Sequence, residues 1–145
     1  MQIQRLKIRD VNKALQVVSI FKGTKVSKPY IQKFLSNDKN YLIVAYQEEN
    51  PTGFILGYEL QRMGDEEPMM FIYEIETLKK YRRQGIARAL IGEFQKICRE
   101  KGFREMFVIT NESNIPAMNL YKATGGYRSS QDDVVFGYDF KKSTN

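Results

Sequence analysis

Apolar residues in the N-terminal half of the chain alternate between strand-like and helical spacing. Residues 3–8 begin with apolar positions at Ile3, Leu6 and Ile8 and predict an opening strand. Residues 11–21 have a helical apolar period, and Asp10 before them is a candidate cap. A second helix is predicted to start at Ser27, where a serine cap is followed by a proline in the first turn. Its buried stripe is expected to comprise Tyr30, Ile31, Phe34 and Leu35.

Three strand-type segments follow these helices. Residues 41–46 form a short apolar run, and the Asn-Pro-Thr-Gly sequence at 50–53 predicts a turn. Further strands are predicted at 54–61 and 69–78, with a polar acidic turn at 64–68 between them. Three consecutive strands joined by short turns predict an antiparallel meander.

The C-terminal half begins with a change to a helical period. Apolar residues across 85–101 define one face of a helix. The remaining predicted elements are a strand at 106–109, a helix at 116–123 that begins with Pro116, and a final strand at 134–140. An extra short strand near Tyr127 remains open. This order predicts a mixed α/β sheet in one domain that spans residues 1–145.

Composition excludes several kinds of chemistry. The 145 residues include no histidine and one cysteine, Cys98. Ser-His and Cys-His nucleophile pairs, histidine metal ligands and an internal disulfide are therefore excluded. Cys98 falls on the apolar face of the helix predicted at 85–101, which favours core packing for its side chain. No metal site is expected, and catalysis must use carboxylates, tyrosines, backbone groups or a cofactor.

The balance of apolar and charged residues is that of a soluble globular protein. Apolar residues make up 42% of the chain and charged residues 28%. No segment approaches the roughly 18 uninterrupted apolar residues of a membrane span. The N-terminal residues lack the apolar run of a signal peptide. We therefore expect a cytoplasmic protein that does not associate with membranes.

The net charge of +6 is distributed unevenly along the chain. Basic residues concentrate at 79–83, whereas acidic residues gather at 65–67, at Glu74 with Glu76, and at 132–133. A basic protein can bind nucleic acid, an anionic membrane or a phosphate-rich cofactor, and the total charge does not choose among them. The sorting of charge by region predicts two surfaces of opposite charge.

The basic segment joins the strand predicted at 69–78 to the helix predicted at 85–101. Gly85 and Ala87 are small, so they leave the N–H groups at the start of that helix unobstructed. Unpaired N–H groups and the helix dipole together make an anion site. The segment matches neither the Walker A loop nor the GxGxxG dinucleotide loop. It predicts a pyrophosphate cradle, and an ordinary turn with solvated charges is the alternative.

This segment resembles the signature of the GNAT superfamily of N-acetyltransferases. Arg82-x-x-Gly85-x-Ala87 matches the Arg/Gln-x-x-Gly-x-Gly/Ala motif of that family. A second family motif follows at the expected distance, with Asn114, Ala117, Leu120 and Tyr121, and then Gly125. The resemblance covers essentially the whole chain. It implies a central, mostly antiparallel, twisted sheet of six to seven strands flanked by about four helices.

More narrowly, several segments resemble the aminoglycoside 3-N-acetyltransferase branch of this superfamily. These are Tyr73 followed by an acidic and an apolar residue, Arg-Arg-Gln-Gly-Ile-Ala, Pro-Ala-x-x-Leu-Tyr and Asp133-Val134-Val135-Phe136. The chain departs from the branch at Glu74, where an aspartate is expected, and at Glu76 and Thr77, which replace small apolar residues. These departures concern the substrate and not the cofactor.

The resemblance implies acetyl-CoA as the cofactor and assigns residues to it. The backbone N–H groups expected to bind the CoA pyrophosphate are those of Arg83, Gln84, Gly85, Ile86 and Ala87. Side-chain contacts are expected from Arg82 and Arg88. The backbone of Ile75 and Thr77 would pair with the pantetheine arm like an added strand, and one of these N–H groups, next to a bulge, would polarise the thioester carbonyl. Asn114 is expected to cap its helix and to bond the same arm.

Three side chains are candidates for the chemistry. An amine must lose a proton before it attacks a thioester, and a nearby carboxylate can accept that proton. Glu74 and Glu76 share one face of their strand, so Glu74 is the candidate base and Glu76 the partner of the substrate cation. Solvent exposure or pairing with an arginine is the alternative for each. The resemblance implies that Tyr121 protonates the departing thiolate, and core packing is its alternative.

The leading hypothesis is therefore an acetyl-CoA-dependent N-acetyltransferase that modifies a small polycationic, aminoglycoside-like amine by direct transfer in a ternary complex. In this family residues 11–35 would form the other wall of the acceptor site. Acetylation of a protein N-terminus or lysine, and a CoA- or nucleic-acid-binding module without turnover, are the alternatives. The leading hypothesis expects a small-molecule partner, no nucleic acid and no membrane, and the family resemblance makes a homodimer a candidate assembly.

Overall fold

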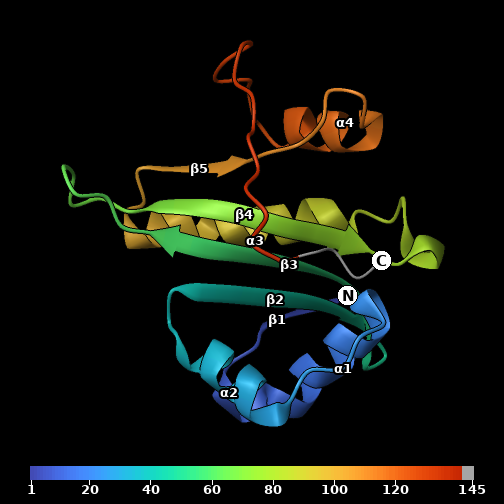
Figure 1. The fold of residues 1–145 in the computed structure, drawn as a ribbon. Coiled ribbons are helices and arrows are strands. Elements are labelled where there is room, and N and C mark those ends of the chain that lie inside the picture. Colours follow the sequence, from blue (N-terminus) through green and yellow to red (C-terminus); the bar gives the residue numbers. More distant parts are fainter. Residues whose placement is uncertain (142–145) are drawn as a thin grey trace.

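The computed structural model describes residues 1–141, which form one five-stranded sheet with helices on both of its faces (Figure 1). The strands are β1 (Gln2–Arg5), β2 (Asn40–Gln47), β3 (Asn50–Leu60), β4 (Met69–Thr77) and β5 (Glu105–Val108). The helices are α1 (Val11–Lys22), α2 (Lys28–Ser36), α3 (Ile86–Lys101) and α4 (Ile115–Ala123), with short 3-10 helices η1 (Ile8–Asp10) and η2 (Lys79–Tyr81). The predicted α/β class and the four helices are confirmed.

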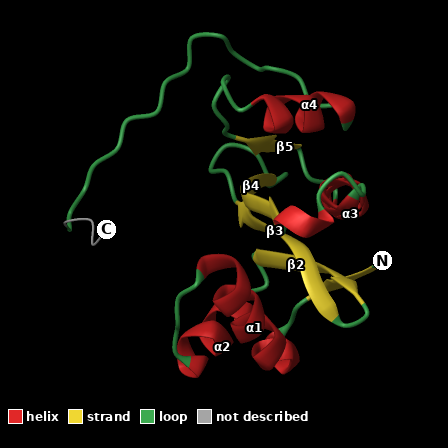
Figure 2. Cartoon of the chain, turned by 90° about the vertical axis from the view of Figure 1, so that its right-hand side faces the viewer, coloured by secondary structure: helices red, strands yellow, loops and turns green. Residues whose placement is uncertain are grey.

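The strands lie in chain order from β1 to β5, and neighbouring strands are antiparallel except for the parallel pair β4 and β5. The predicted meander of β2, β3 and β4 is therefore confirmed. The helix α3 covers one face of the sheet, and α1 and α2 cover the other (Figure 2). Within residues 1–141, no helix combines the length and the apolar character that a bilayer crossing needs.

Alternation along the central strands divides the core between the two faces of the sheet. One cluster lies under α1 and α2 and includes Leu42, Val44 and Phe54. The second cluster lies under α3 and includes Ile43, Ile55, Met70, Ile72, Leu90 and Phe94. Because successive residues of β2 and β3 supply opposite clusters, each strand is apolar on both faces, as a sheet covered on both sides requires.

The turn between β2 and β3 lies earlier than predicted. Gln47 pairs with Asn50, so the loop consists of Glu48 and Glu49, with φ angles of 49° and 68°. Two residues with positive φ define the type I′ hairpin turn, whose twist matches that of the strands. The prediction of a turn at 50–53 was wrong, because β3 already begins at Asn50. Pro51 is tolerated there because β4 reaches only as far as Gly53 along β3, which leaves Pro51 without a second neighbour.

The predictions for the first two helices are largely confirmed, with two corrections. The Ser27 hydroxyl accepts the Tyr30 N–H at 3.2 Å and caps α2. Asp10 does not cap α1 through its side chain, because its carboxylate accepts the Lys7 N–H at 2.9 Å instead. Tyr30, in the first turn of α2, is 60% exposed and does not belong to the buried stripe, whereas Ile31 and Leu35 are buried.

The C-terminal arm, residues 127–141, does not form the predicted final strand. Within residues 1–141 the sheet has five strands, not six to seven, and neither 134–140 nor the segment near Tyr127 pairs with it. Figure 2 shows the arm leaving α4 and running apart from the rest of the chain. The alternating apolar pattern of 134–140 is that of a strand, but a strand also needs a neighbour for its N–H and C=O groups. The sequence pattern does not specify that neighbour.

Candidate active site

β4 extends beyond the end of β5, so the last residues of β4 have no neighbour on that side. The two strands pair in parallel from Met69 opposite Glu105 to Ile72 opposite Val108, where β5 ends. Residues 73–77 of β4 continue with a neighbour only on the β3 side. The register between β3 and β4 shifts at Leu56/Gly57, which leaves Tyr73 as the extra residue of a bulge. The structure thus has a free strand edge and a bulge in the segment where the family resemblance implies both.

The loop after β4 has an unusual backbone for its sequence. The short helix η2 is followed by Arg82, whose Nε donates to the Thr77 carbonyl at 3.3 Å. Arg83 has a φ angle of 63°, and Gly85, the N-cap of α3, has a φ angle of 79°. A non-glycine residue with positive φ is uncommon. Alternation of left-handed with ordinary conformations turns successive N–H groups toward one side, which is the geometry of anion-binding backbone nests.

Five consecutive N–H groups at the end of this loop have no protein acceptor within residues 1–141. Within the described chain, none of the predicted pyrophosphate-binding amides donates to a protein acceptor, and these are the amides of Arg83, Gln84, Gly85, Ile86 and Ala87. The first amide beyond them with a partner, that of Ala89, donates to the Gly85 carbonyl at 3.0 Å. A Cβ atom added at Gly85 would meet nothing within 4 Å, so no neighbouring side chain crowds the loop at this position. The loop therefore has the donors and the room for a phosphate group.

The side chains around the loop mostly bond neighbouring protein groups. Arg88 Nη2 donates to the Ala123 carbonyl at the end of α4, at 3.3 Å. Gln84 Oε1 accepts from Gln47 Nε2 at 3.2 Å. The Thr77 hydroxyl is buried and has no partner within residues 1–141. The arginine contacts hold the loop against β4 and α4, which fixes the direction of the free amides.

Both candidate carboxylates lie on one face of β4, as predicted, and that face is on the α1 side. Lys22, the last residue of α1, forms an ion pair with Glu74, and its Nζ lies 3.8 Å from Glu76 Oε2. The same segment of β4 lines an open cleft of about 510 Å³, whose walls are Lys22, Phe71, Ile72, Tyr73, Glu74 and Ile109. Lys22 belongs to the segment 11–35 that the resemblance implies as the other wall. Its individual role was missed, because no local pattern distinguishes it from other exposed lysines.

Tyr121 and Asn114 are both positioned by α4. The Asn114 Oδ1 atom accepts the Ala117 N–H at 3.2 Å, which confirms its predicted role as the cap. Tyr121 packs against the core cluster under α3, and Ile75 of β4 packs against the same cluster. Burial raises the pKa of the Tyr121 phenol above its ordinary value, so the phenol is protonated at neutral pH. The tyrosine and the glutamates thus lie on opposite faces of β4.

Cys98 is not suited to covalent catalysis. It packs against the cluster under α3, in agreement with the predicted core role. Burial raises the pKa of its thiol to about 11. Because the thiolate is the reactive form of cysteine, Cys98 is unreactive near neutral pH.

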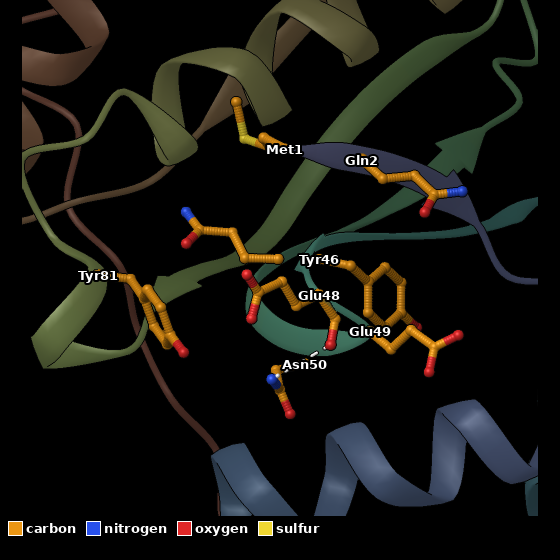
Figure 3. A pocket seen from close by; sticks show the side chains of 8 residues that line it. Met1, Gln2, Tyr46, Glu48, Glu49, Asn50 and Tyr81 are labelled. Carbon is orange, nitrogen blue, oxygen red and sulfur yellow. Dashed lines mark hydrogen bonds between the residues drawn. The ribbon is translucent and has the colours of Figure 1, made fainter.

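A larger hollow, of about 640 Å³, lies where the β2–β3 turn, the start of β1 and η2 come together (Figure 3). Its walls are Met1, Gln2, Tyr46, Gln47, Glu48, Glu49, Asn50 and Tyr81. None of the predicted site residues lines it. Its acidic groups belong to the β2–β3 turn, and the pair drawn with a dashed line is the bond from Asn50 Nδ2 to the Glu48 carbonyl, at 3.3 Å. The candidate catalytic residue Glu74 therefore lines the smaller cleft and not the larger hollow.

A sheet that opens beside β4, with free amides at the start of the following helix, defines the class of GNAT-fold proteins. The sequence agrees, because residues 11–126 match the family model described as "Acetyltransferase (GNAT) family". The chain belongs to this family.

Individual relatives are more distant. The chain is 26% identical over 100 residues to human N-acetyltransferase 8, a match that covers 69% of this chain and 44% of the relative. It is also 26% identical to aminoglycoside N(6')-acetyltransferase type 1 of Serratia marcescens, over 69% of this chain and 65% of the relative. The chain therefore spans less than two thirds of the length of these curated relatives, and less than half of the human one.

Among solved structures, an aminoglycoside acetyltransferase from an uncultured soil metagenomic sample matches over almost the whole chain. The crystal structure with trehalose has a TM-score of 0.86 and 28% identity, and the match covers 97% of this chain and 96% of the other. The same enzyme was also crystallised with sisomicin, at 27% identity to this chain. The two chains thus share the fold over nearly their full length.

Proposed function

We propose that this protein is an acetyl-CoA-dependent N-acetyltransferase that acetylates a primary amine of a small polycationic acceptor, with aminoglycosides as the leading class. The observation that supports it most directly is the set of free amides from Arg83 to Ala87 beside the open edge of β4. The family membership supports the reaction. The chain as a whole forms the catalytic unit in this proposal, and its location is cytoplasmic.

The cofactor would be held at two places. The amides of the loop would bind the pyrophosphate, and Arg82 and Arg88 would add positive charge nearby. The edge of β4 at Ile75 and Thr77 would pair with the pantetheine arm, as an added strand pairs with a sheet edge. Acetyl-CoA, when bound, supplies the acetyl group as a thioester. Asn114 would bond the same arm with the amide nitrogen that its capping role leaves free.

The residues of the chain would then move two protons. Glu74 accepts the proton of the acceptor ammonium, directly or through water, so that the neutral amine is available. Glu76 holds a second cationic group of the acceptor. A backbone N–H beside the Tyr73 bulge stabilises the carbonyl oxygen as charge develops on it. Tyr121 would donate its hydroxyl proton to the departing sulfur from the opposite face of β4. The nitrogen would lose its remaining excess proton to water, and the Tyr121 phenolate would take a proton back from water. The transfer is direct because Cys98 is protonated.

The class of acceptor is inferred from charge and from the relatives. Two carboxylates on one strand attract a molecule with several ammonium groups better than a single amine. A structure similar to this chain is an aminoglycoside acetyltransferase that was crystallised with sisomicin. Protein N-termini and lysine side chains are the alternative acceptors. They would also require a groove long enough for a peptide.

A thioester-consumption assay tests this function. Purified protein is incubated with acetyl-CoA and either sisomicin, a kanamycin-type aminoglycoside, spermidine or short peptides, and the release of CoA thiol is followed. We expect turnover with the aminoglycosides and weak or no turnover with the peptides. Turnover confined to peptides would mean that the acceptor is a protein N-terminus or lysine and not an aminoglycoside. Acetyl-CoA that neither binds in calorimetry nor is consumed with any amine would reject the enzyme assignment.

We also propose that the protein forms a homodimer through its C-terminal arm. Within residues 134–140 of the arm, five large apolar side chains are 73–94% exposed, and they are Val134, Val135, Phe136, Tyr138 and Phe140. Such exposure is costly for a monomer in water. The strand β5 lies at the edge of the sheet, so a second copy could add its arm there. If each copy adds its arm to the β5 edge of the other, the exchange is reciprocal and closes with twofold symmetry.

Sedimentation of the full chain tests the dimer. The double variant V134D/F136D adds charge to one face of the arm and is expected to sediment as a monomer, whereas the wild type sediments as a dimer. M63D is the control, because Met63 is fully exposed outside the arm. A wild type that is monomeric at the highest measured concentration would contradict the dimer without affecting the proposed reaction.

A further inference from the structure

The end of α1 is fixed beside the free segment of β4. Gly23 ends the helix with a φ angle of 63°, and its N–H donates to the Ser19 carbonyl at 3.1 Å. Phe21 packs edge-on against Phe54 of β3, with ring centroids 5.0 Å apart. The Nζ atom of Lys22 lies 5.7 Å from the centroid of the same Phe54 ring. The aliphatic part of the Lys22 side chain therefore lies beside the Phe54 ring, and its ammonium group extends to the carboxylates of β4.

That ammonium group lies between the two carboxylates of the site. Lys22 is paired with Glu74, and Glu76 Oε2 is 3.8 Å away. Within residues 1–141 no other cation is within ion-pair distance of either glutamate. The side chain of Lys22 is 40% exposed, so an incoming cation can compete with it from solvent. A primary ammonium of the protein thus has the two partners that the proposed function gives to the ammonium groups of the acceptor.

We propose that Lys22 occupies the acceptor-ammonium position in the free protein and must be displaced when the acceptor binds. This inference rests on the proposed function, because it takes Glu74 and Glu76 as the acceptor site. Two carboxylates and one ammonium leave a net charge of one negative unit. An acceptor with one ammonium group merely replaces Lys22 as the partner of the carboxylates, so the number of neutralised carboxylates does not increase. An acceptor with two ammonium groups neutralises both carboxylates, so Lys22 sets a threshold of two positive charges for useful binding.

If the ion pair between α1 and β4 has only a structural role, removal of Lys22 has the opposite effect on acceptor binding. If Lys22 serves only to hold the glutamates in position, its removal weakens acceptor binding, because the carboxylates lose their orientation. If Lys22 competes with the acceptor, its removal strengthens binding. The direction of the change therefore separates the two roles.

The test compares three variants with the wild type. K22M removes the charge and keeps a long apolar side chain, K22R keeps the charge, and K25M removes a charge from an exposed lysine that forms no ion pair within the described residues. We expect K22M to lower the KM for sisomicin and for spermidine by about two- to fivefold at low salt, the size of a partly exposed ion pair. The KM for acetyl-CoA should not change, and K22R should resemble the wild type. High salt should reduce the difference.

Calorimetry with spermidine tests the inference independently of turnover. Spermidine is titrated into the wild type, K22M and K25M without acetyl-CoA. Tighter binding to K22M alone supports the displacement of Lys22, even if no acetyl transfer is found with any amine. Equal or weaker binding to K22M than to the wild type would overturn it, whatever the outcome of the thioester assay.

Discussion

Gly57 of β3 lies directly under the ring of Phe94 of α3. A Cβ atom at position 57 would overlap the Phe94 ring and would lie 2.9 Å from Met70 Sδ. Gly53, four residues earlier, has a similar relationship with Ile86, whose Cγ2 atom would be 2.9 Å from an added Cβ. Helix α3 thus rests on two glycines of one strand. This close approach brings the start of α3, with its free amides, next to β4.

The first prediction concerns this packing. G57A should lower the free energy of unfolding by about 1–3 kcal/mol, because the buried Phe94 ring must move to admit a methyl group. G92A, in the middle of α3 with nothing within 4 Å of an added Cβ, is the control and should raise it by about 0.5–1 kcal/mol. Urea unfolding measures both. An unchanged midpoint for G57A would mean that α3 does not pack this closely.

The second prediction concerns the loop amides. G85A should weaken acetyl-CoA binding about tenfold or more, because an alanine disfavours the positive φ angle that orients the free N–H groups. The matched control is G102A at the other end of α3, where φ is 70° and no cofactor contact is expected. Both variants should lose stability, but calorimetry should show lost affinity only for G85A. Equal affinities for the two variants would argue against the cradle.

The third prediction separates the roles of the two glutamates. E74Q should lower kcat by about 100-fold while the Kd of acetyl-CoA stays constant, because the amide cannot accept the proton of the amine. E76Q should act mainly on the KM of the acceptor, since it removes a partner of a cation. E67Q, at an exposed turn residue, is the control. The opposite result, with the larger loss of kcat in E76Q, would exchange the two roles.

The fourth prediction follows from the raised pKa of Tyr121. Burial disfavours the phenolate, so the folded protein loses this proton only above the ordinary pKa of 10.0. If Tyr121 is the acid, kcat should not fall between about pH 7 and pH 9.5 through its titration. Y121F should lower kcat across this whole range and leave acetyl-CoA binding intact. A wild-type kcat that falls in this range, together with an unchanged kcat in Y121F, would point to another proton donor.

Much of the fold could be predicted because the signals are local. The helical period of 86–101, the serine cap of α2 and the glycines that end α1 and α3 each act within a few residues. Two local predictions failed for reasons that are also local. Pro51 made 50–53 look like a turn, although a strand end with one neighbour accepts a proline. Asp10 looked like a helix cap, although its carboxylate bonds the Lys7 amide.

The sequence by itself predicted the candidate pyrophosphate loop. The basic strand–loop–helix segment with Gly85 is a continuous stretch of chain, and its backbone geometry follows from the order of residues. The absence of histidine likewise follows from the sequence alone and limits the chemistry. Only the tertiary structure placed Lys22 at Glu74, 52 residues away, because that contact depends on how α1 packs across β3. The same holds for residues 134–140, whose strand-like pattern lacks a neighbour within the described chain, since pairing is a property of two segments and a pattern belongs to one.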